Sequence, residues 1–248
     1  FQFQNGRTGS LTSQMVINGN FNMTNGTFIG GSSSSADSII FKDGIASATY
    51  TQSGGTMAVT SPVNSRHHFA VYSGKTLTLN NSIIPASSSS SNNWSMTVYS
   101  GGVLDCGTRT IGLGAPNNVT IVNINSGATF RTGHTGGVFS TTTGAAAIVT
   151  TVANATLSSG ATYVFNGTAA QVTSAFTTTP TASTVANMVI NNAAGVTASA
   201  SYNVTSALQL QTGILTLSTF NITAASITGS PYSSTKMVNT NSTGMLGL

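Results

Sequence analysis

The sequence predicts an all-β protein folded as a right-handed parallel β-helix, which is a solenoid, with irregular loops. Three observations indicate this fold class: apolar and polar residues alternate, glycines separate the alternating segments, and the polar residues carry almost no charge. Apolar residues make up 39% of the 248 residues, whereas charged residues make up only 4%. The predicted handedness follows the general preference of parallel crossover connections.

A unit of strand, glycine-containing turn and strand recurs along the chain. Within each strand, apolar residues alternate with Thr, Asn or Ser, which is the period of a strand with one buried face. The glycine of each turn tolerates the positive φ that a tight corner requires. The units lie at 15–23, 69–79, 96–104, 122–130, 155–163, 188–197 and 208–217.

The spacing of the corner glycines bears on two all-β architectures. Successive glycines are 18 to 35 residues apart, which suits a β-helix whose coils carry loops of different lengths. Hairpins in a β-sandwich are the alternative, because Ser-Gly and Asn-Gly also form hairpin turns. We favour the β-helix because Asn, Ser and Thr stack in register between coils, whereas exposed sandwich faces normally carry Lys and Glu. The corner glycines are Gly55, Gly74, Gly102, Gly127, Gly160, Gly195 and Gly213.

We expect residues 1–248 to form a single β-helical segment of a longer polypeptide, with a minor boundary near 177–186. Runs of Ser and Thr, such as 87–91 and 141–143, predict loops that leave the coil. Strand edges at the ends of such a stack pair readily with further strands, and no amphipathic helix caps them. We therefore expect neighbouring copies, or adjacent domains of the same polypeptide, as partners.

The scarcity of charge argues against several classes of function. The seven cations are never adjacent, whereas nucleic-acid binding needs clustered Lys and Arg. No apolar run reaches the length of a membrane span. Asp37 and Asp43 are the only acids close in sequence, and we expect His67 and His68 to lie in a solvated turn without carboxylate partners. The sequence thus predicts no enzyme, no cofactor and no metal site.

Several segments together resemble a family of bacterial proteins. They are 104–111, 123–132, 163–172, 187–196 and 208–217, and they resemble repetitive, β-rich secreted and cell-surface proteins of Bacteroidota, which are adhesin-like substrates of type IX secretion. The resemblance implies an extracellular or cell-surface location and a role as an adhesin, surface fibre or scaffold. Asp37-Ser38-Ile39 also resembles the short O-glycosylation signal of these bacteria, so Ser38 is a candidate for modification; an ordinary loop serine is the alternative.

These observations predict a non-catalytic structural or adhesive segment of a secreted bacterial surface protein or extracellular fibre. The main alternative is a carbohydrate-binding β-helix module, since aromatic rings stack on sugars. Its candidate glycan contacts are Trp94, Tyr99, Tyr72 and His68. Two further alternatives are an ice-binding protein, suggested by the pairs Thr76/Thr78 and Thr108/Thr110, and a polysaccharide-degrading β-helix enzyme, which would need an acid pair.

Overall fold

The computed structural model describes the backbone at residues 2–3, 8–10, 15–17, 19–24, 27–30, 37–41, 47–52, 56–59, 66–83, 93–112, 119–174 and 183–248. Side chains are described at 16–17, 19–24, 49–51, 68–83, 95–112, 121–174 and 183–248. These residues form β-strands joined by turns, together with one short 3-10 turn, η1 (Val152–Asn154). The expected all-β class is therefore confirmed for the described chain.

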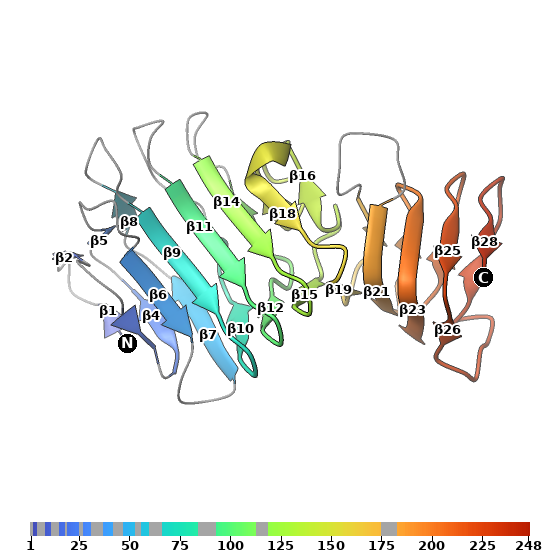
Figure 1. Cartoon of the computed structure of the whole chain (residues 1–248), viewed down its shortest axis with the longest axis horizontal. Coiled ribbons are helices and arrows are strands. Elements are labelled where there is room, and N and C mark those ends of the chain that lie inside the picture. The colour runs from blue at the N-terminus through green and yellow to red at the C-terminus, as the bar shows by residue number, and fades with distance from the viewer. Residues whose placement is uncertain are drawn as a thin grey trace.

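Twelve strands form a long sheet that runs the length of the molecule, with the two chain ends at opposite ends of it (Figure 1). The neighbours in this sheet follow the order of the chain, with other strands intervening in sequence. In spatial order the strands are β1 (Gln2–Phe3), β4 (Phe21–Met23), β7 (Ser47–Gln52), β10 (Thr76–Leu79), β12 (Val103–Asp105), β15 (Thr129–Thr132), β19 (Thr162–Phe165), β21 (Ser183–Asn191), β23 (Tyr202–Thr212), β25 (Ile222–Ala224) and β28 (Leu246–Gly247), with β26 (Ile227–Thr228) also beside β23.

A six-stranded side sheet and three short sheets complete the described strands. The side sheet consists of β18 (Ala155–Leu157), β14 (Val119–Ile124), β11 (Asn93–Val98), β9 (Arg66–Val71), β6 (Asp37–Phe41) and β3 (Met15–Val16). The short sheets consist of β2 (Thr8–Ser10), β5 (Thr27–Gly30) and β8 (Thr56–Val59); β13 (Ile111–Gly112), β17 (Ile148–Val149) and β16 (Phe139–Ser140); and β20 (Gln171–Val172), β22 (Val196–Thr197), β24 (Leu215–Thr216) and β27 (Val238–Asn239).

Every pairing between the described strands is parallel. An antiparallel contact occurs only as an isolated bridge between Ser233 and Lys236 within this part of the chain. Hairpins joined by two-residue turns would place consecutive strands antiparallel. The sandwich alternative is therefore wrong for the strands that the structure describes.

The chain visits the sheets in a repeated order. It passes from β9 in the side sheet to β10 in the long sheet, continues to Ile83, which bridges Ile111, and then returns as β11 beside β9. The next circuit runs through β11, β12 and β13 and returns as β14. Each of these two circuits thus adds one strand to the side sheet and one to the long sheet. The long sheet also continues across the boundary expected near 177–186, because β19 pairs with β21, although 175–182 lie outside the described residues.

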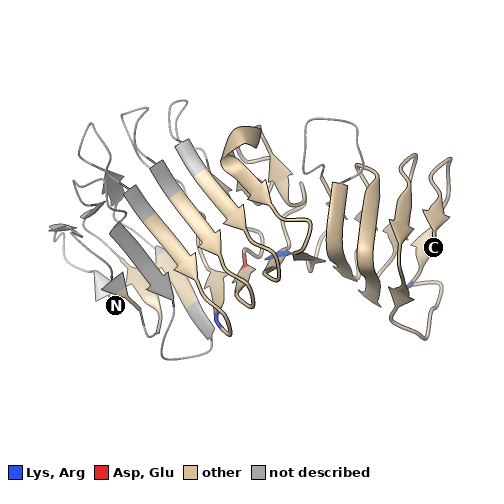
Figure 2. Ribbon diagram, viewed as in Figure 1, with Lys and Arg blue, Asp and Glu red and all other residues tan. Residues whose placement is uncertain are grey.

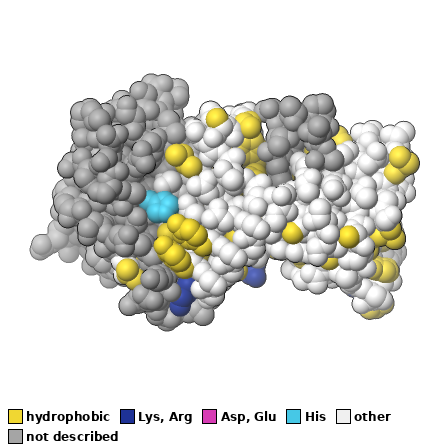
Figure 3. Space-filling view, viewed as in Figure 1, with side chains coloured by type: hydrophobic (Ala, Val, Ile, Leu, Met, Phe, Trp, Pro, Cys, Tyr) yellow, Lys and Arg dark blue, Asp and Glu magenta, His cyan; other side chains and the backbone are white. Residues whose placement is uncertain are grey.

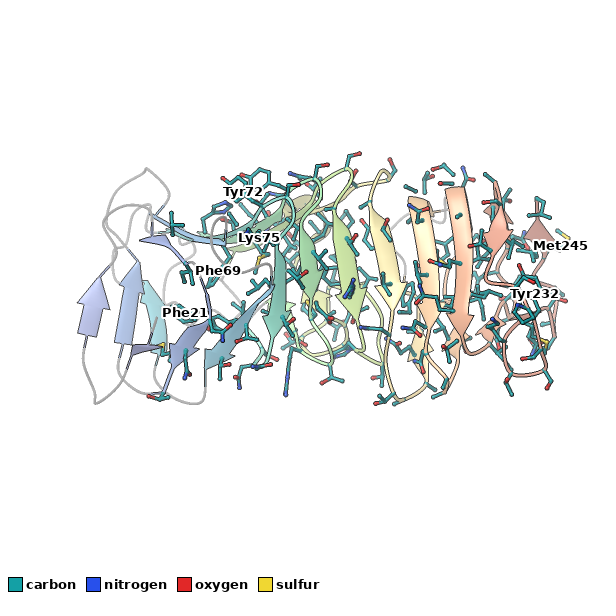
Figure 4. All side chains as sticks on the ribbon, turned by 90° about the horizontal axis from the view of Figure 1, so that it is seen from below. Phe21, Phe69, Tyr72, Lys75, Tyr232 and Met245 are labelled. Atoms are coloured by element: carbon teal, nitrogen blue, oxygen red, sulfur yellow. The ribbon has the colours of Figure 1, made fainter. Side chains whose placement is uncertain are left out.

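The core lies between the sheets and is built from alternate residues of each strand. In β10, β15 and β19, every second residue is buried, as the alternating sequence predicts. The parallel register stacks these residues into columns, and Phe69 belongs to one that faces inward from the side sheet (Figure 4). The longest column is Leu77, Leu104, Phe130, Tyr163, Met188 and Leu208, all of them buried.

Glycines form a stack of corners between the side sheet and the long sheet. Gly74 donates its N–H to the carbonyl of Gly101 at 2.9 Å, and Gly101 donates in the same way to Gly127. Both donors have positive φ. The expectation that Gly102 supplies the positive φ of its corner is wrong, because Gly101 does so. A side chain at Gly102 is excluded for another reason: its Cβ would lie 2.7 Å from the carbonyl oxygen of Val71.

Candidate functional site

The clearest exposed feature that the structure assembles is a pair of stacked tyrosines at these corners. Tyr72 and Tyr99 directly follow β9 and β11, and the Tyr99 N–H donates to the Val71 carbonyl at 2.9 Å. Because the two turns stack in register, the ring centroids lie 4.6 Å apart with an interplanar angle of 20°. Both rings are half-buried. Tyr72 and Lys75 lie in the same part of the molecule (Figure 4).

His68 lies in β9, four residues before Tyr72, so that both side chains belong to the outward set of alternate residues. Its Nδ1 lies 2.6 Å from the Oγ of Ser95, which is its partner in the register with β11. Desolvation by burial lowers the pKa of His68, which favours the neutral imidazole. The expected solvated turn at His67 and His68 is wrong, because both residues lie in strand β9.

The phenol of Tyr99 is also held in its neutral form. Desolvation by burial raises its pKa, and the charge of Tyr72 and a hydrogen bond to Tyr72 raise it further. On the same face, Figure 3 shows a histidine, a group of hydrophobic side chains and a basic side chain close together. We call Tyr72, Tyr99, His68 and Ser95 the tyrosine corner. A ligand bound there could contact the edges of the tyrosine rings, a neutral imidazole and hydroxyl groups.

The other two residues singled out by the sequence are placed only by their backbones. Trp94 lies in β11 beside His67, and its side chain is outside the described residues. The side chain of Ser38 is likewise outside them. Its backbone lies in strand β6, paired with His68, and not in a loop as the alternative reading expected. The structure therefore brings together Tyr72, Tyr99 and His68, and leaves the other two side chains undescribed.

The threonines considered for ice binding do not continue as an array. Thr76 pairs with Val103 in the next strand, and Thr78 pairs with Asp105. Thr108 and Thr110 lie in the turn that follows β12, outside a strand. A flat threonine surface would need threonine at the same position in each successive circuit, but β12 has Val and Asp at these positions.

Charged residues are sparse in the described part of the chain (Figure 2). No group of three or more His, Cys, Asp or Glu side chains gathers among the described residues. Asp105 accepts a hydrogen bond from the N–H of Gly107 at 3.0 Å, which ties its carboxylate to the following turn. Cys106 is buried, and desolvation, followed by the charge of Asp105, raises the pKa of its thiol. The Asp43 position lies outside the described residues.

Sequence reasoning missed a buried amide network formed by Gln171 of β20 and Asn192, which follows β21. Gln171 donates from Nε2 to the carbonyls of Thr132 and His134, each at 3.0 Å. Its Oε1 accepts from the Gly167 N–H and from Nδ2 of Asn192, each at 2.8 Å. In a chain rich in Asn and Ser, no signal sets these two amides apart. Their role is to hold the turn after β19 to the turn after β21.

Comparison with protein-family models, with curated proteins and with solved structures found no match for this chain. Within the described residues, no helix has the length and the apolar character needed to cross a membrane.

Proposed function

We propose that the repeated circuits form a right-handed parallel β-helix, and that this solenoid is a non-catalytic structural or adhesive segment of a surface protein or extracellular fibre. The parallel register supports the solenoid, because consecutive circuits lie beside each other in the long sheet and in the side sheet. The right hand is the usual one for parallel crossovers. Such a stack is quasi-one-dimensional, so it extends by adding circuits.

The observation that carries the proposal is a set of uncharged side-chain hydrogen bonds, each of which joins two neighbouring circuits. Asn side chains donate from Nδ2 to the Thr Oγ1 of the neighbouring strand: Asn80 to Thr51, Asn123 to Thr97 and Asn187 to Thr162, at 2.9, 3.4 and 3.1 Å. These contacts repeat along the stack and involve no titratable group. A rod stabilised by such hydrogen bonds can serve a structural role, which requires no catalytic centre.

The resemblance to surface proteins of Bacteroidota supports an extracellular setting for this rod. Adjacent domains, or further copies of the chain, are the partners that a stack of parallel strands accepts most readily, because an edge strand can pair with a further strand through its backbone. In an adhesive role, the rod would hold a binding surface at a distance from the cell.

Electron microscopy of the native material tests the proposal. We expect rods or filaments whose width matches one circuit and whose length grows with the number of circuits. The matched measurement is small-angle scattering of the isolated chain, which should give an elongated particle. Compact, roughly spherical particles in both measurements would refute the rod.

Carbohydrate contact at the tyrosine corner is a second candidate function, because two half-buried rings stand together beside His68. The stack occupies one face of each ring, so a sugar would meet the outer faces and the ring edges. Replacing Tyr72 and Tyr99 together by Ala should abolish glycan binding if this corner is the contact. Retention of binding by the folded double variant would exclude it.

A further inference from the structure

A groove crosses the outward face of the long sheet at the strands β15, β19, β21 and β23. Its volume is about 380 Å³, and its lining is predominantly polar. Four adjacent strands at a spacing of about 4.8 Å give it a length of roughly 14 Å along the axis of the stack. The lining residues are Thr129, Arg131, Thr162, Val164, Asn166, Val189, Asn191 and Gln211.

Two valines form an apolar floor in this groove. Val164 and Val189 pair in the register of β19 and β21, at positions that point away from the core. Val189 is nevertheless only 6% exposed, whereas its neighbours Met188 and Ile190 face the core. An outward valine that is nearly buried indicates that the sheet face is hollowed here. This floor is shaped for the C–H face of a flat apolar group.

Hydrogen-bonding groups surround the floor, and one of them lacks a protein partner. The Oδ1 of Asn166 is buried and accepts no hydrogen bond from the described residues. Such an acceptor costs free energy unless a donor reaches it. The Thr162 hydroxyl accepts from Asn187 and keeps its own hydrogen available, while Asn191 and Gln211 expose their amides. The rim therefore offers both donors and acceptors.

The groove carries little charge. Among the lining residues that the structure describes, Arg131 alone is charged, and Asp105 of β12 is its partner in the register. The Asp105 carboxylate turns to the Gly107 N–H. A single guanidinium beside a carboxylate does not favour a polyanion, which would need several cations. Figure 2 shows the acidic residue and a basic residue close together in the middle of the molecule.

We propose that this groove binds a neutral polysaccharide, with sugar rings on Val164 and Val189 and sugar hydroxyls on Arg131, Asn166 and the neighbouring amides. The ligand lies along the axis of the stack, across the strands. Sugars combine an apolar ring face with hydroxyls that both donate and accept, which matches the floor and the rim. The groove lies on a different sheet face from the tyrosine corner, and binding here does not depend on whether the chain forms filaments.

Binding is measured by isothermal titration of the intact chain with neutral polymers (dextran, galactomannan and xylan) and with polyuronates (alginate and polygalacturonate). We expect a neutral polymer to bind, with an affinity that changes less than about twofold between roughly 50 mM and 1 M NaCl. Val164→Trp fills the groove and should abolish binding. Arg131→Gln and Asn166→Ala should each weaken it about tenfold, since each removes a hydrogen-bonding group.

Thr156→Trp is the matched control, because it adds the same ring at an exposed position of β18 in the side sheet, away from the lining. It should bind as the parent chain does, and so should the double alanine variant at Tyr72 and Tyr99. Circular dichroism and thermal melts check the fold of each variant; if Val164→Trp does not fold, Arg131→Gln and Asn166→Ala decide. Binding to no neutral polymer, a preference for polyuronates that vanishes in salt, or loss of binding only at the tyrosine corner would overturn the proposal.

Discussion

Two regions of the molecule both pair their strands in parallel, but they differ in how the chain changes direction from one strand to the next. In residues 66–165, which we call the corner region, a tight turn separates each side-sheet strand from the next long-sheet strand, as between β14 and β15. In residues 183–248, the continuous region, β21 and β23 run for 9 and 11 residues without such a turn (Figure 1). Their pairing instead shifts register between Val185 and Asn187.

The difference shows that a chain can change direction between sheets in two ways. A tight turn needs a residue at positive φ or with no side chain, which is why Gly101 and Gly127 stand at corners. A bulge bends the strand by inserting an extra residue and needs no glycine. Paired residues are 27 apart from Phe69 to Met96 but only 19 apart from Ser183 to Tyr202. The bulge thus accompanies a shorter circuit.

Among the predicted changes, removal of an aromatic side chain from the core should lower the free energy of unfolding the most. The same variant tests whether the two regions unfold together. Phe130 is fully buried in the corner region and contacts Tyr163, at 6.5 Å between ring centroids. Phe130→Ala should lower the free energy of unfolding by about 3–5 kcal/mol, because it leaves a cavity. Urea unfolding measures the loss, and Phe130→Leu should recover more than half of it. Hydrogen exchange that speeds up only in 66–165 would show that the regions unfold separately.

Glycine-to-alanine substitutions should have the next largest effect on the free energy of unfolding, and they allow the turns of the two regions to be compared directly. Gly213→Ala should cost about 3 kcal/mol or more, because φ is positive and the new Cβ would lie 1.8 Å from the backbone oxygen of Asn192. Gly101→Ala should cost about 2 kcal/mol, since its close contact is the Ser73 hydroxyl, which can rotate away. Gly144→Ala is the control, with similar φ and open space, and should cost about 1 kcal/mol. Equal losses at all three sites would contradict this ranking.

The corner region was largely predictable from the sequence, whereas the continuous region was predictable only around Gly195 and Gly213, where the expected turns are found. Alternation and glycine indicated the strands on either side of Gly74 and Gly127, because these residues meet a local requirement of the backbone. The unit expected to begin at Met188 misses the first five residues of β21, because 183–187 contain no glycine and no break in polarity. A bulge depends on the register with β23, which a local pattern does not contain.

The same distinction applies to the sites. Tyr72 and Tyr99 occupy the same position in two similar units, so their contact follows once the units stack. The groove could not be predicted, because Arg131, Val164 and Val189 come from three strands whose loops differ in length. Only the register brings them together. The acceptor on Asn166 is likewise ordinary in sequence, and its missing partner is a property of the folded chain.

Disrupting the buried amide network, which lies between the two regions in sequence, should have a moderate effect on stability. Gln171→Leu leaves the Gly167 N–H without its acceptor and removes one donor each from the Thr132 and His134 carbonyls, which keep a backbone N–H partner. We therefore expect a loss of about 1–3 kcal/mol in the free energy of unfolding. Gln211→Leu, at an exposed position of β23, is the control and should change it by less than about 0.5 kcal/mol. Similar denaturation midpoints for the two variants would mean that the network contributes little.

The smallest expected effect is a pH dependence located in the corner region. Burial lowers the folded-state pKa of His68, and that of His134 as well, below their ordinary values. A group of this kind contributes its full stability above the unfolded-state pKa of about 6.5, and the contribution is lost as the pH falls through the lower folded-state pKa. The thermal midpoint should therefore decrease on acidification below that value, and His68→Gln should flatten the decrease, with His134 supplying the remainder. Thermal melts of both proteins between neutral and mildly acidic pH measure this difference, and parallel curves would remove His68 as a source of it.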